Sequence, residues 1–346
     1  MKEDIASMTL PELTAAMAKL GQPKYRAGQI FRWLHKVGVR DFDEMTDLPR
    51  QLRADLSNNF VIFSCSIEKK LCSAYDNTVK YLFRLHDGEI IESVVMQYKY
   101  GYTVCVSSQV GCRMGCKFCA STLDGVVRNL TPSEILAQIY AAERDLSIRV
   151  SHVVMMGMGE PLDNYDAVMR VIEVLTSDWG FGWSPKRITL STIGVLPNLR
   201  RYLDECKCHL AVSVHNPFPE ERFSIMPVQK AWPLRDVVDL IRKYDFTGQR
   251  RVSFEYTMFA GFNDDRRHAD ALARLFSGLE CRVNLIRFHK IPDFPYETSP
   301  DAVMERFRDR LSAHGVTTTI RSSRGEDILA ACGLLAGKHK NVTNDE

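Results

Sequence analysis

From about residue 100 onward, short apolar and β-branched runs alternate with longer stretches whose apolar residues recur at helical spacing. The short runs predict strands and the longer stretches predict helices, because the two structures repeat their side-chain directions at different periods. We predict strands at 102–107, 151–156, 187–191, 209–214, 251–257, 282–287 and 316–321. We predict helices at 131–146, 163–176, 233–244, 265–277 and 301–313. This alternation indicates an α/β protein with a parallel sheet of βα units, open or closed as a barrel.

The first hundred residues follow different patterns. Two helical stretches, Leu10–Leu20 and Ala27–Val37, are separated by the helix-breaking sequence Gly21-Gln22-Pro23. Apolar and polar residues then alternate between 60 and 97, which predicts short antiparallel strands. We therefore divide the chain into a helical accessory domain at 1–60, a short β linker region at 61–97, a core at 98–337 and a frayed tail at 338–346.

The composition is that of an ordinary globular protein: 346 residues, 45% hydrophobic, with a net charge of +2 from 45 basic and 43 acidic residues. The N-terminal residues lack the order of a secretory signal, and no apolar run of about 18 residues or more predicts a membrane span. We expect a cytoplasmic protein, in which clustered cysteines more often bind metal or do chemistry than form disulfides. Five scattered cysteines are interpreted as small core residues: Cys65, Cys72, Cys206, Cys208 and Cys281.

Three further cysteines form the strongest local motif. Cys112, Cys116 and Cys119 have the spacing C-x3-C-x2-C directly after a predicted strand, and Gly111 and Gly115 allow the loop to wrap tightly. Three thiolates on one loop can hold three irons of a [4Fe-4S] cluster and leave the fourth iron open to the amino and carboxylate groups of S-adenosylmethionine (SAM). The alternative is a structural zinc site, which needs four ligands, and no fourth Cys or His lies within the loop.

Polar residues recur where successive predicted strands end, which favours a mouth lined with ligand-binding groups over ordinary turns. In Gly157-Met158-Gly159-Glu160-Pro161, the carboxylate of Glu160 is suited to accept hydrogen bonds from an ammonium group. The residues singled out at the later strand ends are Ser191, Ser213, Val214, His215 and His289.

The cysteine loop, the longer string Cys105–Cys112 and the motif Ala330-Ala331-Cys332-Gly333 together resemble the RlmN/Cfr family of radical SAM RNA adenosine methyltransferases. The resemblance runs from about Lys19 to Gly337. It implies a partial (βα) radical SAM barrel, an N-terminal helical domain that binds RNA, one [4Fe-4S] cluster and SAM. It also implies that Gly159 and Glu160 contact the SAM amino group, with the other strand-end residues bordering the cofactor. Where the family often has Asn, this chain has His289, whose imidazole can also donate a hydrogen bond.

The resemblance further implies three catalytic roles. Cys332 takes a methyl group from one SAM as a thiolate, and a radical from a second SAM activates that S-methyl group for addition to adenine. Glu92 accepts the proton of the ring carbon. Cys105 then attacks the Cys332 sulfur, and the resulting transient disulfide releases the methylated base. Without the resemblance, Cys105 and Cys332 would be interpreted as buried thiols and Glu92 as an exposed strand residue, since its alternation with Ser93 and Val94 does not indicate which face it takes.

The implied substrate is 23S rRNA and, in some members of the family, tRNA, with a reducing electron donor such as flavodoxin and a monomeric enzyme. One branch of the family methylates C2 of adenine and the other C8, and the shared cysteines do not separate them. The segment Arg321–Ile328 looks more like the C2 branch. A different class, a non-catalytic RNA-binding protein with zinc, also stays open. Basic residues that could contact phosphates are Lys24, Arg26, Arg32, Lys36, Arg40, Arg50, Arg53, Arg200, Arg201, Arg321 and Arg324.

Overall fold

One large mixed sheet carries the elements that position the candidate site. The computed structural model describes residues 2–246, 250–291 and 294–335. The 10-stranded sheet has the order β14-β13-β12-β11-β10-β9-β6-β5-β4-β3, parallel from β6 to β14 and antiparallel from β3 to β6. Its strands are β3 (Ser66–Cys72), β4 (Val79–Arg84), β5 (Ile90–Tyr98), β6 (Gly101–Cys105), β9 (Val150–Met155), β10 (Ile188–Thr192), β11 (His209–Ser213), β12 (Val252–Met258), β13 (Arg282–Arg287) and β14 (Thr317–Ile320).

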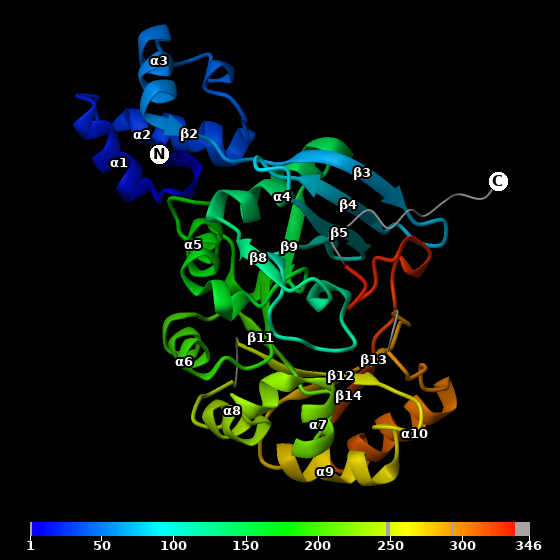
Figure 1. Cartoon of the computed structure of the whole chain (residues 1–346). Coiled ribbons are helices and arrows are strands. Elements are labelled where there is room, and N and C mark those ends of the chain that lie inside the picture. Colours follow the sequence, from blue (N-terminus) through cyan, green and yellow to red (C-terminus); the bar gives the residue numbers. More distant parts are fainter. Residues whose placement is uncertain (1, 247–249, 292–293, 336–346) are drawn as a thin grey trace, which may run out of the picture.

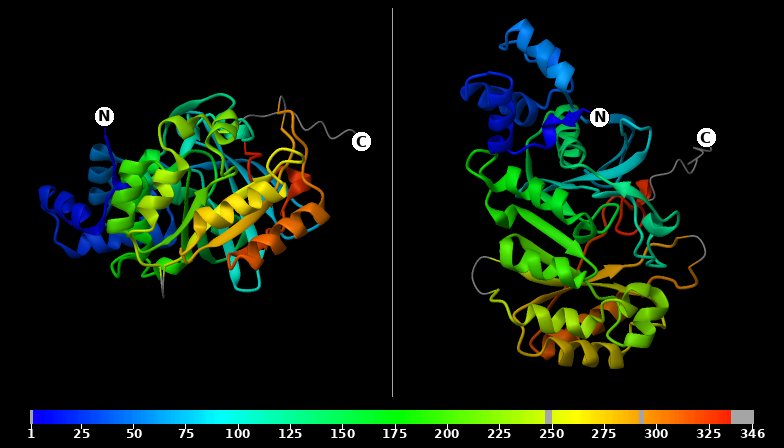
Figure 2. Two further views of the ribbon diagram at one scale, coloured as in Figure 1. Left: turned by 90° about the horizontal axis from the view of Figure 1, so that it is seen from below. Right: turned by 60° about the vertical axis from the view of Figure 1, so that its left-hand side comes forward.

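Helices connect the parallel strands and cover the outer side of the curved sheet (Figures 1 and 2). They are α4 (Pro132–Leu146), α5 (Tyr165–Thr176), α6 (Leu196–Glu205), α7 (Pro219–Ile225), α8 (Leu234–Ile241), α9 (Arg266–Phe276) and α10 (Asp301–Ala313). The start of α4 follows directly from its sequence, since Thr131 and Glu134 form a reciprocal capping box. The predicted α/β class and partial barrel are confirmed, whereas α6 and α7 were not predicted and α8 is shorter than the predicted 233–244.

The antiparallel strands extend the same sheet rather than forming a separate unit. β4 pairs with β5, and β5 pairs with β6, so hydrogen bonding continues across the boundary predicted at residue 98. The region 61–97 therefore supplies the predicted antiparallel strands, which form one edge of the sheet. The reason is that β5 and β6 are joined by a tight turn, which leaves them side by side.

The N-terminal helices stand beyond one end of the sheet, next to α4 and α5 (Figure 1). They are α1 (Leu10–Lys19), α2 (Tyr25–Arg32), which continues as a π-helical turn over Trp33–Val37, and α3 (Arg50–Asn59). The short strands β1 (Glu3–Asp4) and β2 (Phe60–Val61) pair and close this region on itself. No helix among the described residues has the length and apolar character needed to cross a membrane.

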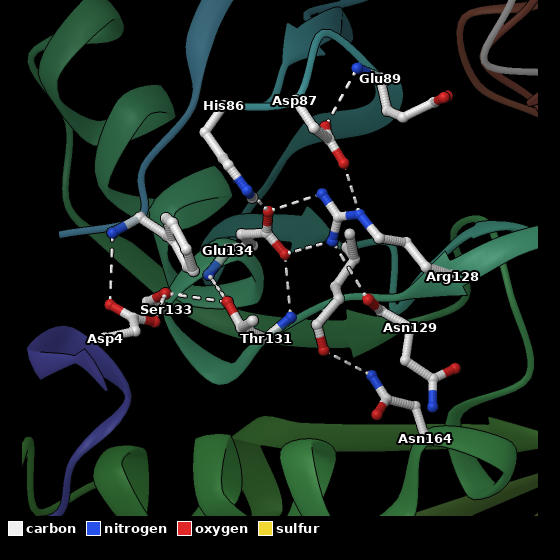
Figure 3. A network of polar contacts seen from close by, with 12 residues as sticks. Asp4, His86, Asp87, Glu89, Arg128, Asn129, Thr131, Ser133, Glu134 and Asn164 are labelled. Carbon is white, nitrogen blue, oxygen red and sulfur yellow. Dashed lines mark hydrogen bonds and ion pairs between the residues drawn. The ribbon is translucent and has the colours of Figure 1, made fainter. Parts of the chain in front are cut away.

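A polar network joins the β4–β5 turn to α4 and to β8 (Val126–Asn129), which pairs with β7 (Gln109–Gly111) (Figure 3). The guanidinium of Arg128 donates to both carboxylate oxygens of Glu134 at 2.8 and 2.9 Å and to Asp87 at 2.6 Å. The Ser133 hydroxyl donates to Asp4, which links the N-terminal region to the same place. Because Glu134 is fully buried, this paired network fixes the base of the loop between β7 and β8.

After β14 the chain crosses from one edge of the sheet toward the other and reaches the β3–β4 hairpin (Figure 1). Asp327 accepts hydrogen bonds from the Ser73 hydroxyl and the Ala74 amide, both at 2.8 Å. Further along, the Gly333 carbonyl accepts from the Ala120 amide at 2.7 Å. These contacts bring the C-terminal segment, residues 321–335, against the loop that carries the three clustered cysteines.

Candidate active site

The cysteine loop begins at the end of β7 and closes over a pocket. Cys112 and Cys116 are buried, Cys119 is half-buried, and all three line this pocket. Gly111 has a φ of +75°, and a Cβ at that position would lie 2.0 Å from the Gly125 carbonyl oxygen, so only glycine permits the two strands to approach so closely. The loop therefore holds three thiols together on one wall.

The donor chemistry of this wall fits an iron–sulfur cluster. Burial raises the pKa of the Cys112 thiol to about 12 and raises those of Cys116 and Cys119, so these thiols become thiolates only when bound cations offset the desolvation. Across the described ranges, no three His, Cys, Asp or Glu side chains converge on one point as ligands of a single metal ion. A cluster takes one thiolate per iron, so its cysteines need not converge on a single point.

The ends of the parallel strands supply the opposite wall of the pocket. Of the residues predicted to bind the cofactor, Gly159, Glu160, Ser191, Ser213 and His215 line it. Val214 and His289 are not among its lining residues. Val214 is buried, and the His289 Nε2 atom lies 3.0 Å from the Ser323 hydroxyl. Contact of these two residues with SAM stays a prediction.

Glu160 is a buried carboxylate that three hydrogen bonds hold in place. It accepts hydrogen bonds from the Thr192 hydroxyl at 2.6 Å and from the amides of Ile193 and Leu162 at 3.0 and 3.1 Å. Burial nevertheless raises the pKa of Glu160 to about 7, against the opposing effect of these hydrogen bonds. An arriving ammonium group would stabilise the ionised form, which suits Glu160 to bind a cationic ligand.

His215 has a strained backbone and a defined ring. Its φ is +57°, uncommon for a residue with a side chain, and the Asn263 side-chain amide donates to its carbonyl at 2.6 Å. The His215 Nδ1 atom accepts from the Thr257 amide at 2.9 Å, which places the proton on Nε2. Burial lowers the pKa of His215 to about 3, so the imidazole stays neutral and can donate one hydrogen bond into the pocket.

Cys105 and Cys332 lie near each other although they are far apart in the sequence. Cys332 is an exposed residue that lines the pocket, and Cys105 is buried at the end of β6. Burial, together with the nearby Cys332, raises the pKa of the Cys105 thiol to about 12. Desolvation by surrounding atoms also raises the pKa of the Cys332 thiol, while the guanidinium of Arg321 lowers it.

The register of the antiparallel strands determines the direction of Glu92. Val94 is opposite Cys105 on β6, and Glu92 lies two residues before Val94 on β5, so the side chains of Glu92 and Cys105 point to the same face. Glu92 is buried and its Oε2 atom lies 2.8 Å from the Nζ atom of Lys80. The interpretation of Glu92 as an exposed residue is therefore excluded.

Several residues at the site were not singled out from the sequence. The side chain of Gln109 accepts from the Glu160 amide and donates to Asp163, which holds two walls of the pocket together. Glu255 also lines the pocket, and its position inside a predicted strand gave no sign of this role. Arg321 was expected on the surface and instead lines the pocket, 3.5 Å from Glu255, because the chain turns inward after β14.

The scattered cysteines and basic residues are partly as expected. Cys65, Cys206 and Cys208 are buried, and the half-buried Cys281 packs against the core. Cys72 is exposed, so the core interpretation is wrong for this residue. Cys72 ends the edge strand β3, where one face is open. Most basic residues of the N-terminal helices are exposed, and two of them, Arg32 and Arg53, form ion pairs with Asp47 and Asp43.

The parallel strands, the cysteine loop and the pocket beneath it are the features that define a radical SAM enzyme. Residues 106–272 match the model of the Radical SAM superfamily. Residues 3–62 match the model of the ribosomal RNA large subunit methyltransferase N-terminal domain. A crystal structure of a radical SAM methyltransferase from Sphaerobacter thermophilus is 40% identical, with a TM-score of 0.92 over 97% of this chain and 100% of that one.

Similar proteins identify the family within this class of enzymes. The probable dual-specificity RNA methyltransferase RlmN of Parabacteroides distasonis is 49% identical over 99% of this chain and 98% of its own length. The protein with the same description from Porphyromonas gingivalis is 49% identical over 96% of both chains. The chain belongs to the RlmN family, and it is a SAM-dependent RNA methyltransferase of the radical SAM type.

Proposed function

We propose that this enzyme methylates C2 of an adenosine in the peptidyl-transferase region of 23S rRNA, through a methyl group carried on Cys332. The observation that carries the proposal is the proximity of Cys105 to Cys332, which lines the pocket beneath the cysteine loop. A ring carbon of adenine is a poor nucleophile, so a methyl carrier that reacts as a radical meets the chemical need. Two thiols are then required, one to carry the methyl group and one to release the product.

The three loop cysteines would hold the [4Fe-4S] cluster, and Glu160, Ser191, Ser213 and His215 would border SAM. When bound, the cluster and SAM supply the methyl group, the electron and the carbon radical that the reaction needs. The chain's own residues do the rest. Cys332, which lines the pocket, carries the methyl carbon to the base. Glu92, on the same sheet face as Cys105, takes the ring proton. Cys105 then forms a disulfide with Cys332 and frees the methylated base.

Three further features belong to the proposal. The relatives described as dual-specificity enzymes support tRNA as a second substrate, at the adenosine 3′ of the anticodon. The exposed basic residues of the N-terminal helices support contact with RNA phosphates. A reducing protein such as flavodoxin would supply electrons to a monomeric enzyme in the cytoplasm.

The test is an anaerobic reaction of the reconstituted enzyme with SAM, a reductant and unmodified 23S rRNA, followed by mass spectrometry of the nucleosides. We expect 2-methyladenosine. The appearance of 8-methyladenosine instead would overturn the assignment of C2. If the protein holds its cluster and cleaves SAM but produces no methylated adenosine, the rRNA substrate is wrong.

A further inference from the structure

Lys80 is a buried cation that has no role in the reaction as proposed above. It lies on β4 and is only 4% exposed. Its Nζ atom is 2.8 Å from the Glu92 carboxylate and donates a hydrogen bond of 2.9 Å to the carbonyl oxygen of Leu329. A lysine is rarely buried unless it is paired, and here one ammonium group has two partners from distant parts of the chain.

Strand register places Lys80 on the catalytic face of the sheet. Lys80 is opposite Val94 on β5, and Val94 is opposite Cys105 on β6, so these three side chains point to one side. Leu82 is opposite Glu92, which puts Glu92 on that side too. The face therefore carries an ammonium, a carboxylate and a thiol in neighbouring positions.

The second partner of Lys80 belongs to the C-terminal segment. Leu329 has a φ of +53°, a left-handed conformation that side chains disfavour, and it lies three residues before Cys332. Its carbonyl is held by Lys80, and the neighbouring Ala330 amide is held by the Gly325 carbonyl at 2.8 Å. Lys80 thus reaches from the sheet to the turn that presents Cys332.

We propose that Lys80 is a positioning residue for proton removal, because its ammonium holds the Glu92 carboxylate and the Cys332-bearing turn in one arrangement. The inference rests on the proposed function, in which Glu92 accepts the ring proton. In that step the proton of the ring carbon moves to a Glu92 oxygen, and its bonding electron pair stays on the base. Lys80 keeps the acceptor aligned with the base that Cys332 holds.

The experiment isolates this step with RNA that carries deuterium at C2 of the target adenine. In a Cys105→Ala background the final thiol attack is absent, so the covalent enzyme–RNA adduct accumulates. Its deuterium content can then be measured by mass spectrometry. With Lys80 intact, we expect the adduct to lose its deuterium. With Lys80→Met added, we expect adduct formation and SAM cleavage to continue while deuterium loss slows about 10- to 100-fold.

Two variants provide the controls. Lys80→Arg keeps the charge and should restore much of the deuterium loss. Lys70→Met removes a lysine from the neighbouring strand β3, where its Nζ atom lies 2.6 Å from Asp145, and should leave deuterium loss unchanged. Because an uncompensated Glu92 can prevent folding, Lys80→Gln, which keeps a hydrogen-bond donor without the charge, is the second test variant.

The possible outcomes distinguish a failure of the role of Lys80 from a failure of the proposed methyl-carrier function. Deuterium loss at the normal rate in folded Lys80→Met or Lys80→Gln overturns the role of Lys80. Equal losses of SAM cleavage and proton removal also overturn it, since Lys80 would then support the whole pocket. If the Cys105→Ala protein with Lys80 intact forms no adduct, the proposed methyl-carrier function fails instead.

Discussion

The parallel and the antiparallel halves of the sheet build the site in different ways. In the parallel half, binding groups such as Glu160, Ser191 and Ser213 lie where strands end and loops begin. In the antiparallel half, Lys80 and Glu92 lie within strands and are selected by the face to which they point. The parallel half is suited to hold a cofactor at the ends of its strands. The antiparallel half is suited to place reacting side chains near that cofactor.

The C-terminal segment joins the two halves. It leaves the parallel edge after β14, passes Arg321 and Glu255 at the pocket, and attaches to β3 and β4 through Asp327 and Leu329. The difference between the halves therefore predicts two classes of variant. Changes in the parallel half should abolish SAM binding or cleavage, whereas changes in the antiparallel half should spare cleavage and stop later steps.

The largest effect is expected from Cys116→Ala. Loss of one of the three thiolates should prevent a stable cluster, so both SAM cleavage and RNA methylation should fall to background. Iron content and 5′-deoxyadenosine formation measure this directly. Cys281→Ala removes a half-buried thiol outside the loop and should keep both. Full SAM cleavage by Cys116→Ala would contradict the assignment of the loop.

The next effect is expected from Cys105→Ala, in the antiparallel half. SAM cleavage should continue, but repeated turnover should stop because no thiol is available to attack Cys332. Gel electrophoresis under denaturing conditions should reveal protein bound covalently to RNA. Cys65→Ala, another buried thiol, serves as the matched control and should turn over normally. Release of methylated RNA by Cys105→Ala at the normal rate would rule out the resolving role.

A smaller effect is expected from Glu160→Gln. Loss of a charge-assisted hydrogen bond should weaken SAM binding about 10-fold or more. In the intact protein the pKa of Glu160 is about 7, so ionised Glu160 becomes more abundant as the pH rises through that value, and SAM affinity should rise with it. Titration of SAM at several pH values checks both points. If the SAM affinity of Glu160→Gln rose as steeply with pH as that of the intact protein, a group other than Glu160 would cause the pH dependence.

The smallest effect is expected from Asp327→Ala, at the attachment of the C-terminal segment. Its two hydrogen bonds to the β3–β4 hairpin are exposed, so their loss should lower the free energy of unfolding by about 1 kcal/mol or less. Methylation should fall modestly, because the segment still has the Lys80 contact. Thermal unfolding and a methylation assay measure the two effects, and a loss as large as that of Cys105→Ala would mean that the segment has no second anchor.

The sequence was most informative about the parallel half, where local patterns and structure coincide. Strand periodicity depends on neighbouring residues, and it led to the observed strands. The cysteine spacing also depends on neighbouring residues, and the three thiols line one pocket. The face of Glu92 depends on register between strands. The contact of Lys80 with Leu329 joins residues 249 positions apart, and that of Arg321 with Glu255 joins residues 66 positions apart. One sequence contains no local signal for such contacts.

The exposed position of Cys72 shows the same limit. The neighbours of Cys72, Leu71 and Ser73, do not reveal that β3 is the edge of the sheet. Likewise, α6 was missed because Pro197 and the charged residues Arg200 and Arg201 weaken its apolar pattern, although proline is well tolerated in the first turn of a helix.

The most direct test of the central claim follows a methyl group through one turnover. Enzyme is first exposed to SAM with a deuterated methyl group, freed of SAM, and then given unlabelled SAM, reductant and RNA. We predict that peptide mass spectrometry finds the label on Cys332 before RNA is added, and that the methylated adenosine of the first turnover contains it. Methylated adenosine that lacks the label, from enzyme whose Cys332 was unlabelled throughout, would contradict the account.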